Sequence, residues 1–414
     1  MSTPPRSKNP WRRATATPRA RKRPRKEISS AMTSPMAGVR LAWPDVARGI
    51  SIMGVVVLHV SLAVPEGQLT WLAQLNSFIH PLRLPLFFVV SGYFSTKVLS
   101  MTFSQLFTRR LWFLLVPYLV WGLVELHTNS LLYHVAFGDP VRGVGENLGI
   151  LALGHSMGWF LHSLILYNCF LWLVRNRPVW QALVASFFPL LLLGFAGDLY
   201  AIGKAVMFLP VFVAGALLRE YIREFANAIE SCARPTWKTF AAYTVAIGGY
   251  VAGLAVRDGW DHRPNAVLDL PWITPGAATV GTPEIYLLLR ATEQALELPM
   301  AIAAAVLIAR IPTLCAPLRF VGRHTLALYL GHPIALTLGF GFLHHYLGAD
   351  IFLGGPFPLG STRVWVVICL GICAAGGLAL WAVGKIPYLS WSLRPPAIEP
   401  CTAAPKARAT QTQA

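Results

Sequence analysis

The stretch WPDVARGISIMGVVVLHVSLAV, from Trp43 to Val64, predicts a membrane-spanning helix that carries two ionisable side chains. Arg48 and His59 are eleven residues apart. At about 100° and 1.5 Å per residue, they lie on one face of the helix, about 16 Å apart along its axis. Ionisable groups at that depth usually face a bundle interior or a wet cavity, so both are candidates for function. An equally acceptable interpretation is that Arg48 extends to the cytoplasmic interface and that His59 packs in the core.

The composition indicates an all-α polytopic membrane protein. Of the 414 residues, 55% are hydrophobic and 13% are charged, and apolar runs of membrane-spanning length recur along the chain. We predict ten transmembrane helices, at residues 46–64, 77–96, 110–127, 158–174, 180–197, 205–218, 238–256, 284–309, 325–347 and 364–384.

The net charge of +17 is concentrated before the first span. Residues 1–40 contain eight Arg and three Lys but only one acidic residue, in a segment rich in Pro and Ser. We expect residues 1–40 to be a disordered cytoplasmic tail, residues 41–390 the membrane domain, and residues 391–414 a second disordered tail. The basic run lacks interleaved aromatic residues, so contact with the lipid bilayer is expected and nucleic-acid binding is not.

The distribution of basic residues predicts the topology. With the N-terminal tail in the cytoplasm, 27 Lys and Arg residues fall in cytoplasmic segments and five in outer segments. This asymmetry predicts that both termini are cytoplasmic. No cleaved signal peptide is expected, because the first apolar run starts some 45 residues in and holds Arg48. The six cysteines show no metal-ligand spacing and no disulfide framework, so no metal site is expected.

Further polar residues occur within or beside the other predicted spans. His80 and Arg83 precede the proline-interrupted second span, where they could share a cavity with His59 or mark the outer interface. Glu125 in the third span could orient a catalytic imidazole, or could be solvated at the interface. His332 could be a second cavity histidine or a packing residue.

The remaining polar motifs have simpler interpretations. The pair Arg109–Arg110 at the mouth of the third span is typical of a topology anchor, and also suits a phosphate-bearing cytoplasmic donor. Arg290, Glu293 and Glu297 share one helical face, which favours a structural ion pair. Phosphate-binding loops, dinucleotide fingerprints and hydrolase motifs are absent from the sequence.

Five segments together resemble the integral-membrane acyltransferase-3 family, the bacterial O-acyltransferases that modify envelope glycans and glycolipids. They are Asp45-x-x-Arg48 with His59 eleven residues later, PLFFVVSGYF (85–94), the RR…VPYLVW run (109–121), GWFLHSLILY (158–167) and GRHTLALYLGHPI (322–334). The opening segment is similar to that of actinobacterial members, some of which acetylate trehalose mycolates. The resemblance covers about residues 40–385.

The resemblance implies transfer of an acyl group, with acetyl expected, from cytoplasmic acyl-CoA to a hydroxyl of an envelope glycolipid or glycan. In this scheme His59, Arg48 and Glu125 form the catalytic group. Acyl-CoA (acetyl-CoA) is a co-substrate rather than a permanently bound cofactor. The expected substrate-binding residues are Asp45, His80, Arg83, Arg109, Arg110 and His332.

The outer loops would then bind the acceptor, with Trp260, Asp261, His262 and Asp269 as polar candidates. An envelope lipid exporter is a possible further partner. The competing hypothesis is a non-enzymatic lipid or glycan translocase, because buried charge and kinked helices suit a transport path as well as they suit catalysis.

Overall fold

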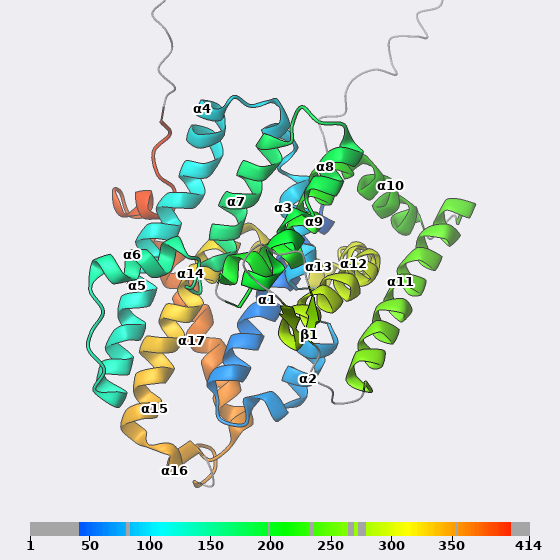
Figure 1. Ribbon diagram of the computed structural model, residues 1–414. Helices are drawn as coiled ribbons and strands as arrows, with labels where there is room; N and C mark the ends of the chain where they lie inside the picture. The colour runs from blue at the N-terminus through cyan, green and yellow to red at the C-terminus, as the bar shows by residue number, and fades with distance from the viewer. Residues whose placement is uncertain are drawn as a thin grey trace, which may run out of the picture. The chain divides into compact units, whose positions relative to one another are not determined.

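Helices form almost all of the structure in the computed structural model of this protein (Figure 1). The structure describes residues 41–79, 83–197, 199–231, 235–263, 269–271, 279–352 and 355–398. The α-helices are α1 (Trp43–Ala63), α2 (Trp71–Phe78), α3 (Leu84–Tyr93), α4 (Phe103–Leu106), α5 (Trp112–Phe137), α6 (Val144–Ala152), α7 (Trp159–Leu173), α8 (Val179–Ala185), α9 (Tyr200–Leu217), α10 (Arg219–Glu230), α11 (Trp237–Asp261), α12 (Thr282–Ile308), α13 (Pro312–Arg323), α14 (Thr325–Ala335), α15 (Phe342–Leu347), α16 (Ala349–Phe352) and α17 (Thr362–Val383). Two short strands, β1 (Asp269–Pro271) and β2 (Thr279–Gly281), pair antiparallel between α11 and α12.

The helices confirm a multi-pass membrane protein. Within the described residues, seven helical segments are long and apolar enough to cross a membrane: Trp43–Ala63, Phe103–Phe137, Tyr200–Leu217, Trp237–Asp261, Thr282–Ile308, Thr325–Leu347 and Thr362–Val383. Three shorter apolar segments, Leu84–Ser100, Trp159–Leu173 and Val179–Phe195, lie at the other predicted spans. They are short or irregular; Phe188–Phe195, for example, is a 3₁₀-helix with Pro189 near its start. A total of ten spans and the side of each terminus stay predictions.

Two of the long segments contain π-helical turns. Phe107–Leu111 joins α4 to α5, and Leu336–Gly341 joins α14 to α15. Each π-helical turn lies near an interior proline, Pro117 in α5 and Pro333 in α14. Proline removes a backbone hydrogen bond from a helix, and single π-helical turns occur frequently at functional sites. Arg110 lies within the first π-helical turn, and His332 lies four residues before the second.

The central helix α3 packs very closely on α9. A methyl group added at Gly92 would collide with the carbonyl oxygen of Phe212, and one added at Gly215 would collide with the carbonyl oxygen of Val89. Small residues allow helix backbones to approach closely inside a membrane. Gly92 and Gly215 therefore let the backbones of α3 and α9 come into contact. Phe88 of α3 is fully buried here, against Phe160, Tyr167 and Phe208.

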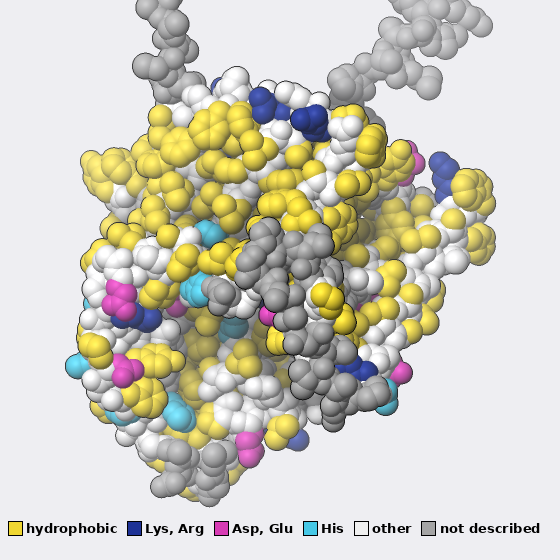
Figure 2. Space-filling view, in the orientation of Figure 1, with side chains coloured by type: hydrophobic (Ala, Val, Ile, Leu, Met, Phe, Trp, Pro, Cys, Tyr) yellow, Lys and Arg dark blue, Asp and Glu magenta, His cyan; other side chains and the backbone are white. Residues whose placement is uncertain are grey.

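Around this centre, α1 packs on α13 and α3, α14 packs on α17, and α11 packs on α12 (Figure 1). Helix α1 begins with Pro44 and Asp45 in its first turn, where a fixed φ angle and a negative charge both favour a helix N-terminus. Hydrophobic side chains cover much of the face seen in Figure 2, and Lys and Arg side chains lie at the end near α4 and α8.

Candidate active site

Two histidines from helices distant in the sequence meet inside the helix bundle. His59 Nδ1 of α1 lies 2.8 Å from His332 Nε2 of α14, and the two rings are nearly parallel. His332 is 1% exposed, whereas His59 is partly accessible. The structure therefore places both predicted cavity histidines in one site.

The hydrogen bonds of this pair define which nitrogen is free. His332 Nδ1 lies 2.9 Å from the carbonyl oxygen of Leu328, which can only accept, so His332 Nδ1 carries the proton. In the neutral ring, His332 Nε2 is then an acceptor, and His59 Nδ1 donates to it. His59 Nε2 is left with a lone pair and has no hydrogen-bond partner among the described residues. The arrangement suits a general base held in one tautomer by a second histidine.

A cluster of three arginines lies at the end of α3, and we call it the arginine cluster: Arg48, Arg110 and Arg219. The Arg48 guanidinium lies 4.7 Å from the centre of the Phe94 ring. Arg110 donates to the Phe94 carbonyl oxygen at 3.2 Å and to Ser95 Oγ at 2.6 Å. Three chain segments thus bring positive charge to the turn that follows α3.

The third member, Arg219, begins α10. Its guanidinium lies 4.9 Å from the centre of the Tyr93 ring and donates to Thr96 Oγ1 at 3.2 Å. Arg110 and Arg219 bond only neutral groups within the described part of the chain, so their charge is available to an anion. Arg109, next to Arg110, is exposed.

Asp45 lies at the same end of the bundle but has a structural partner. Its carboxylate is 1% exposed and accepts a hydrogen bond from Arg323 Nε of α13 at 3.1 Å. A buried carboxylate needs such a partner, because an unpaired charge in the interior is costly. This ion pair fixes α1 against α13, and the expected contact of Asp45 with a substrate stays a prediction.

Glu125 is buried in α5, but it does not contact His59. One carboxylate oxygen accepts a hydrogen bond from the backbone N–H of Met157, and Oε2 has no partner. The hydroxyl of Tyr329 donates to the Met157 carbonyl at 2.5 Å, and the Tyr329 ring lies 6.2 Å from that of His332. Glu125 is thus linked to the histidine pair only through Met157 and Tyr329, and its expected role in orienting a catalytic imidazole stays a prediction.

Arg83 lies beside the histidine pair, close enough to act electrostatically on His59. Its carbon stem packs on Gly54 of α1, where an added methyl group would meet Arg83 Cγ at 2.7 Å. The Arg83 side chain is 8% exposed. The neighbouring candidate His80 lies outside the described residues.

Of the four outer-loop candidates, two line a cavity, one is exposed, and one has a side chain outside the described structure. Trp260 and Asp261 line a polar cavity together with Arg83. His262 is exposed, and its pKa is raised by its hydrogen bond to the Asp258 carbonyl and by the charge of Asp258. The backbone of Asp269 starts β1, but its side chain lies outside the described part of the structure.

Sequence reasoning missed Arg219 as a site residue. It occurs where an apolar run ends, and the sequence analysis only counts it among the 27 cytoplasmic Lys and Arg residues. It also missed Arg257 as a second partner of Glu293, although the predicted pair between Arg290 and Glu293 is confirmed at 2.9 Å. No spacing rule within one helix could have revealed either contact, because each joins two different helices.

Comparison with known protein families matches residues 41–382 to a family described as an acyltransferase domain, acyltransferase-3. The match includes both histidines and all three members of the arginine cluster. No curated protein and no solved structure matches the chain.

Proposed function

The chain belongs to the acyltransferase-3 family and is a membrane acyltransferase, and from this premise we propose that it transfers an acetyl group from cytoplasmic acetyl-CoA to a hydroxyl of a cell-envelope glycolipid or glycan. The observation that carries the proposal is the pair His59–His332, which leaves His59 Nε2 as an oriented, unprotonated nitrogen. Such a nitrogen is what deprotonation of an attacking hydroxyl requires.

In this mechanism the arginine cluster binds the donor. CoA carries its phosphates at one end of a long flexible arm and its thioester at the other. Arg48 and His59 are about 16 Å apart along α1, at 1.5 Å per residue. An acyl-CoA with its phosphates at Arg110 and Arg219 would extend along α1 and present the thioester carbonyl near His59. Guanidinium groups suit phosphates because they donate paired, charge-assisted hydrogen bonds.

The chemical step is a transfer from sulfur to oxygen. His59 Nε2 accepts the proton of the acceptor hydroxyl as its oxygen attacks the thioester carbonyl, and a new C–O bond forms. The C–S bond then breaks, and the proton passes from His59 to the leaving thiolate, which gives CoA and an ester. His332 accepts the Nδ1 proton of His59 in a hydrogen bond and so stabilises the imidazolium formed in between.

The acceptor is the molecule that carries the hydroxyl to be acylated. An envelope glycolipid or glycan follows from the family resemblance, with trehalose mycolate as one candidate, and a bacterial inner membrane is the corresponding location. Transfer at or beyond the outer side of the membrane would place acceptor recognition near Arg83 and the α11–α12 loop.

The proposal is tested with purified full-length protein in nanodiscs. Acetyl-CoA binding and acetyl transfer to an envelope lipid extract are compared for wild type, Arg48→Ala, His59→Ala and the control His127→Ala, an exposed histidine in α5. Arg48→Ala should lose binding, and His59→Ala should bind without transfer. If well-folded wild-type protein does not bind acetyl-CoA, the acetyltransferase proposal fails and a translocase becomes the better hypothesis.

A further inference from the structure

A polar cavity of about 260 Å³ lies near the C-terminal end of α11 and the N-terminal half of α12, away from the arginine cluster. Its lining includes Arg83, Arg257, Arg290 and Glu293, with Trp260 and Tyr286 as aromatic walls. The mechanism above uses none of its residues in the chemical step. We call it the Arg83 cavity.

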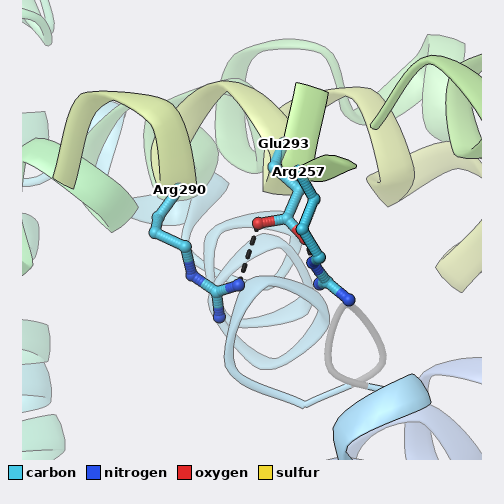
Figure 3. Close-up of polar contacts among 3 residues, drawn as sticks. All are labelled: Arg257, Arg290 and Glu293. Carbon is cyan, nitrogen blue, oxygen red and sulfur yellow. Dashed lines mark hydrogen bonds and ion pairs between the residues drawn. The ribbon is translucent and has the colours of Figure 1, made fainter. Parts of the chain in front are cut away.

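Two of the three arginines have an anionic partner within the protein. Glu293 is fully buried and forms ion pairs with Arg257 of α11 and with Arg290 one turn earlier in α12 (Figure 3). Glu297, one turn later in α12, is also fully buried and acts electrostatically on both of these arginines. Arg257 and Arg290 thus share one anionic partner, Glu293, within the protein.

Arg83 is the exception. It is 8% exposed, it forms no hydrogen bond or ion pair with any described residue, and the like charges of Arg290 and Arg257 act on it electrostatically. Asp261 also lines the cavity, but it is exposed and largely screened by solvent. A buried guanidinium without an anion is costly, so its retention beside a cavity points to a ligand that supplies the negative charge.

The aromatic walls narrow the class of ligand. The Trp260 and Tyr286 rings lie 5.8 Å apart, and Arg263 covers Trp260 at 3.6 Å. Tyr286 is 41% exposed and offers an apolar face next to the charged groups. An aromatic face beside a guanidinium fits a sugar ring that bears a carboxylate or a phosphate.

We propose that the Arg83 cavity binds an anionic group on the acceptor, so that the acceptor is a sugar bearing a carboxylate or phosphate near the hydroxyl that His59 activates. This inference rests on the proposed function for the identity of the reaction. It favours an acidic glycan or phosphoglycolipid over trehalose mycolate, which has no charged group.

The test measures how sugars shift the thermal unfolding midpoint of the purified full-length protein in detergent. The probes are glucuronate and glucose 6-phosphate, with neutral glucose as the matched control. The variants are Arg83→Gln and, as a matched control, Arg363→Gln, an exposed arginine at the start of α17. Acetyl-CoA is titrated into the same samples to report on the donor site separately.

We expect at least one charged sugar, but not glucose, to stabilise wild type and Arg363→Gln. Arg83→Gln should bind it about tenfold more weakly, as loss of one charge-assisted contact implies, and should still bind acetyl-CoA. The proposal is overturned if wild type does not distinguish charged from neutral sugars, or if Arg83→Gln responds as wild type does. If Arg83→Gln does not fold, the wild-type comparison decides alone. If wild type responds to a charged sugar but not to acetyl-CoA, the donor proposal is refuted instead.

Discussion

The histidine pair makes a specific prediction about His332, which contacts His59 and need not contact either substrate. In His332→Ala the acceptor for His59 Nδ1–H is removed, and a partly buried donor is left unsatisfied. An unsatisfied buried group costs about 1–3 kcal/mol, which corresponds to about a 5- to 150-fold loss of rate if the pair is intact in the transition state. His332→Gln places an amide oxygen near the lost Nε2 and should restore most of the activity.

The assay is steady-state acetyl transfer by purified protein with acetyl-CoA varied at a fixed acceptor concentration. We expect His332→Ala to lower kcat and to leave the KM for acetyl-CoA nearly unchanged, because His332 lies far from the arginine cluster. His332→Gln should recover to within about fivefold of wild type, the effect of about 1 kcal/mol. Equal losses in the two variants, or a loss confined to KM, would show that His332 does not orient the base.

Two further predictions concern the donor site and the packing of the bundle. Arg110→Gln should weaken CoA binding about tenfold, whereas Arg109→Gln should not, because only Arg110 belongs to the arginine cluster. Calorimetric titration of CoA into each variant measures this difference. Equal effects of the two substitutions would contradict the assignment of Arg110 to the donor site. Gly92→Ala should destabilise the protein by about 1–3 kcal/mol, because its methyl group would collide with the Phe212 carbonyl. Gly145→Ala, which has open space around it, should be neutral or stabilising in the same thermal unfolding measurement, and similar losses would refute this packing argument.

The sequence predicted the helical segments well, because membrane spans depend on local hydropathy. The limits of α1 and α17 differ from the predicted spans by only a few residues. The segment Leu84–Ser100 was harder to define, since Pro85 and a 3₁₀ turn at Thr96–Ser100 shorten its regular part. Such irregular helices depend on tertiary contacts, such as that of Gly92 with α9, which hydropathy does not describe.

The candidate site was predicted only in part. The helical period placed Arg48 and His59 on one face, but it could not show that His59 would pair with His332, which is 273 residues away. For the same reason the sequence could not show that the hydrogen-bond partner of His59 is His332 rather than Glu125. Arg110 and Arg219 join Arg48 only because three chain segments meet at the end of α3. Counting charges along the sequence gives the number of arginines on each side of the membrane, but it does not show which of them lie close together.

The most direct test of the account is a structure of the protein with a non-hydrolysable acetyl-CoA analogue bound in nanodiscs. We predict that the CoA phosphates contact Arg110 and Arg219, and that the acyl carbonyl lies next to His59 Nε2 with room for an acceptor hydroxyl between them. A CoA that binds away from the arginine cluster, or an acyl carbonyl beyond the reach of His59, would contradict the account.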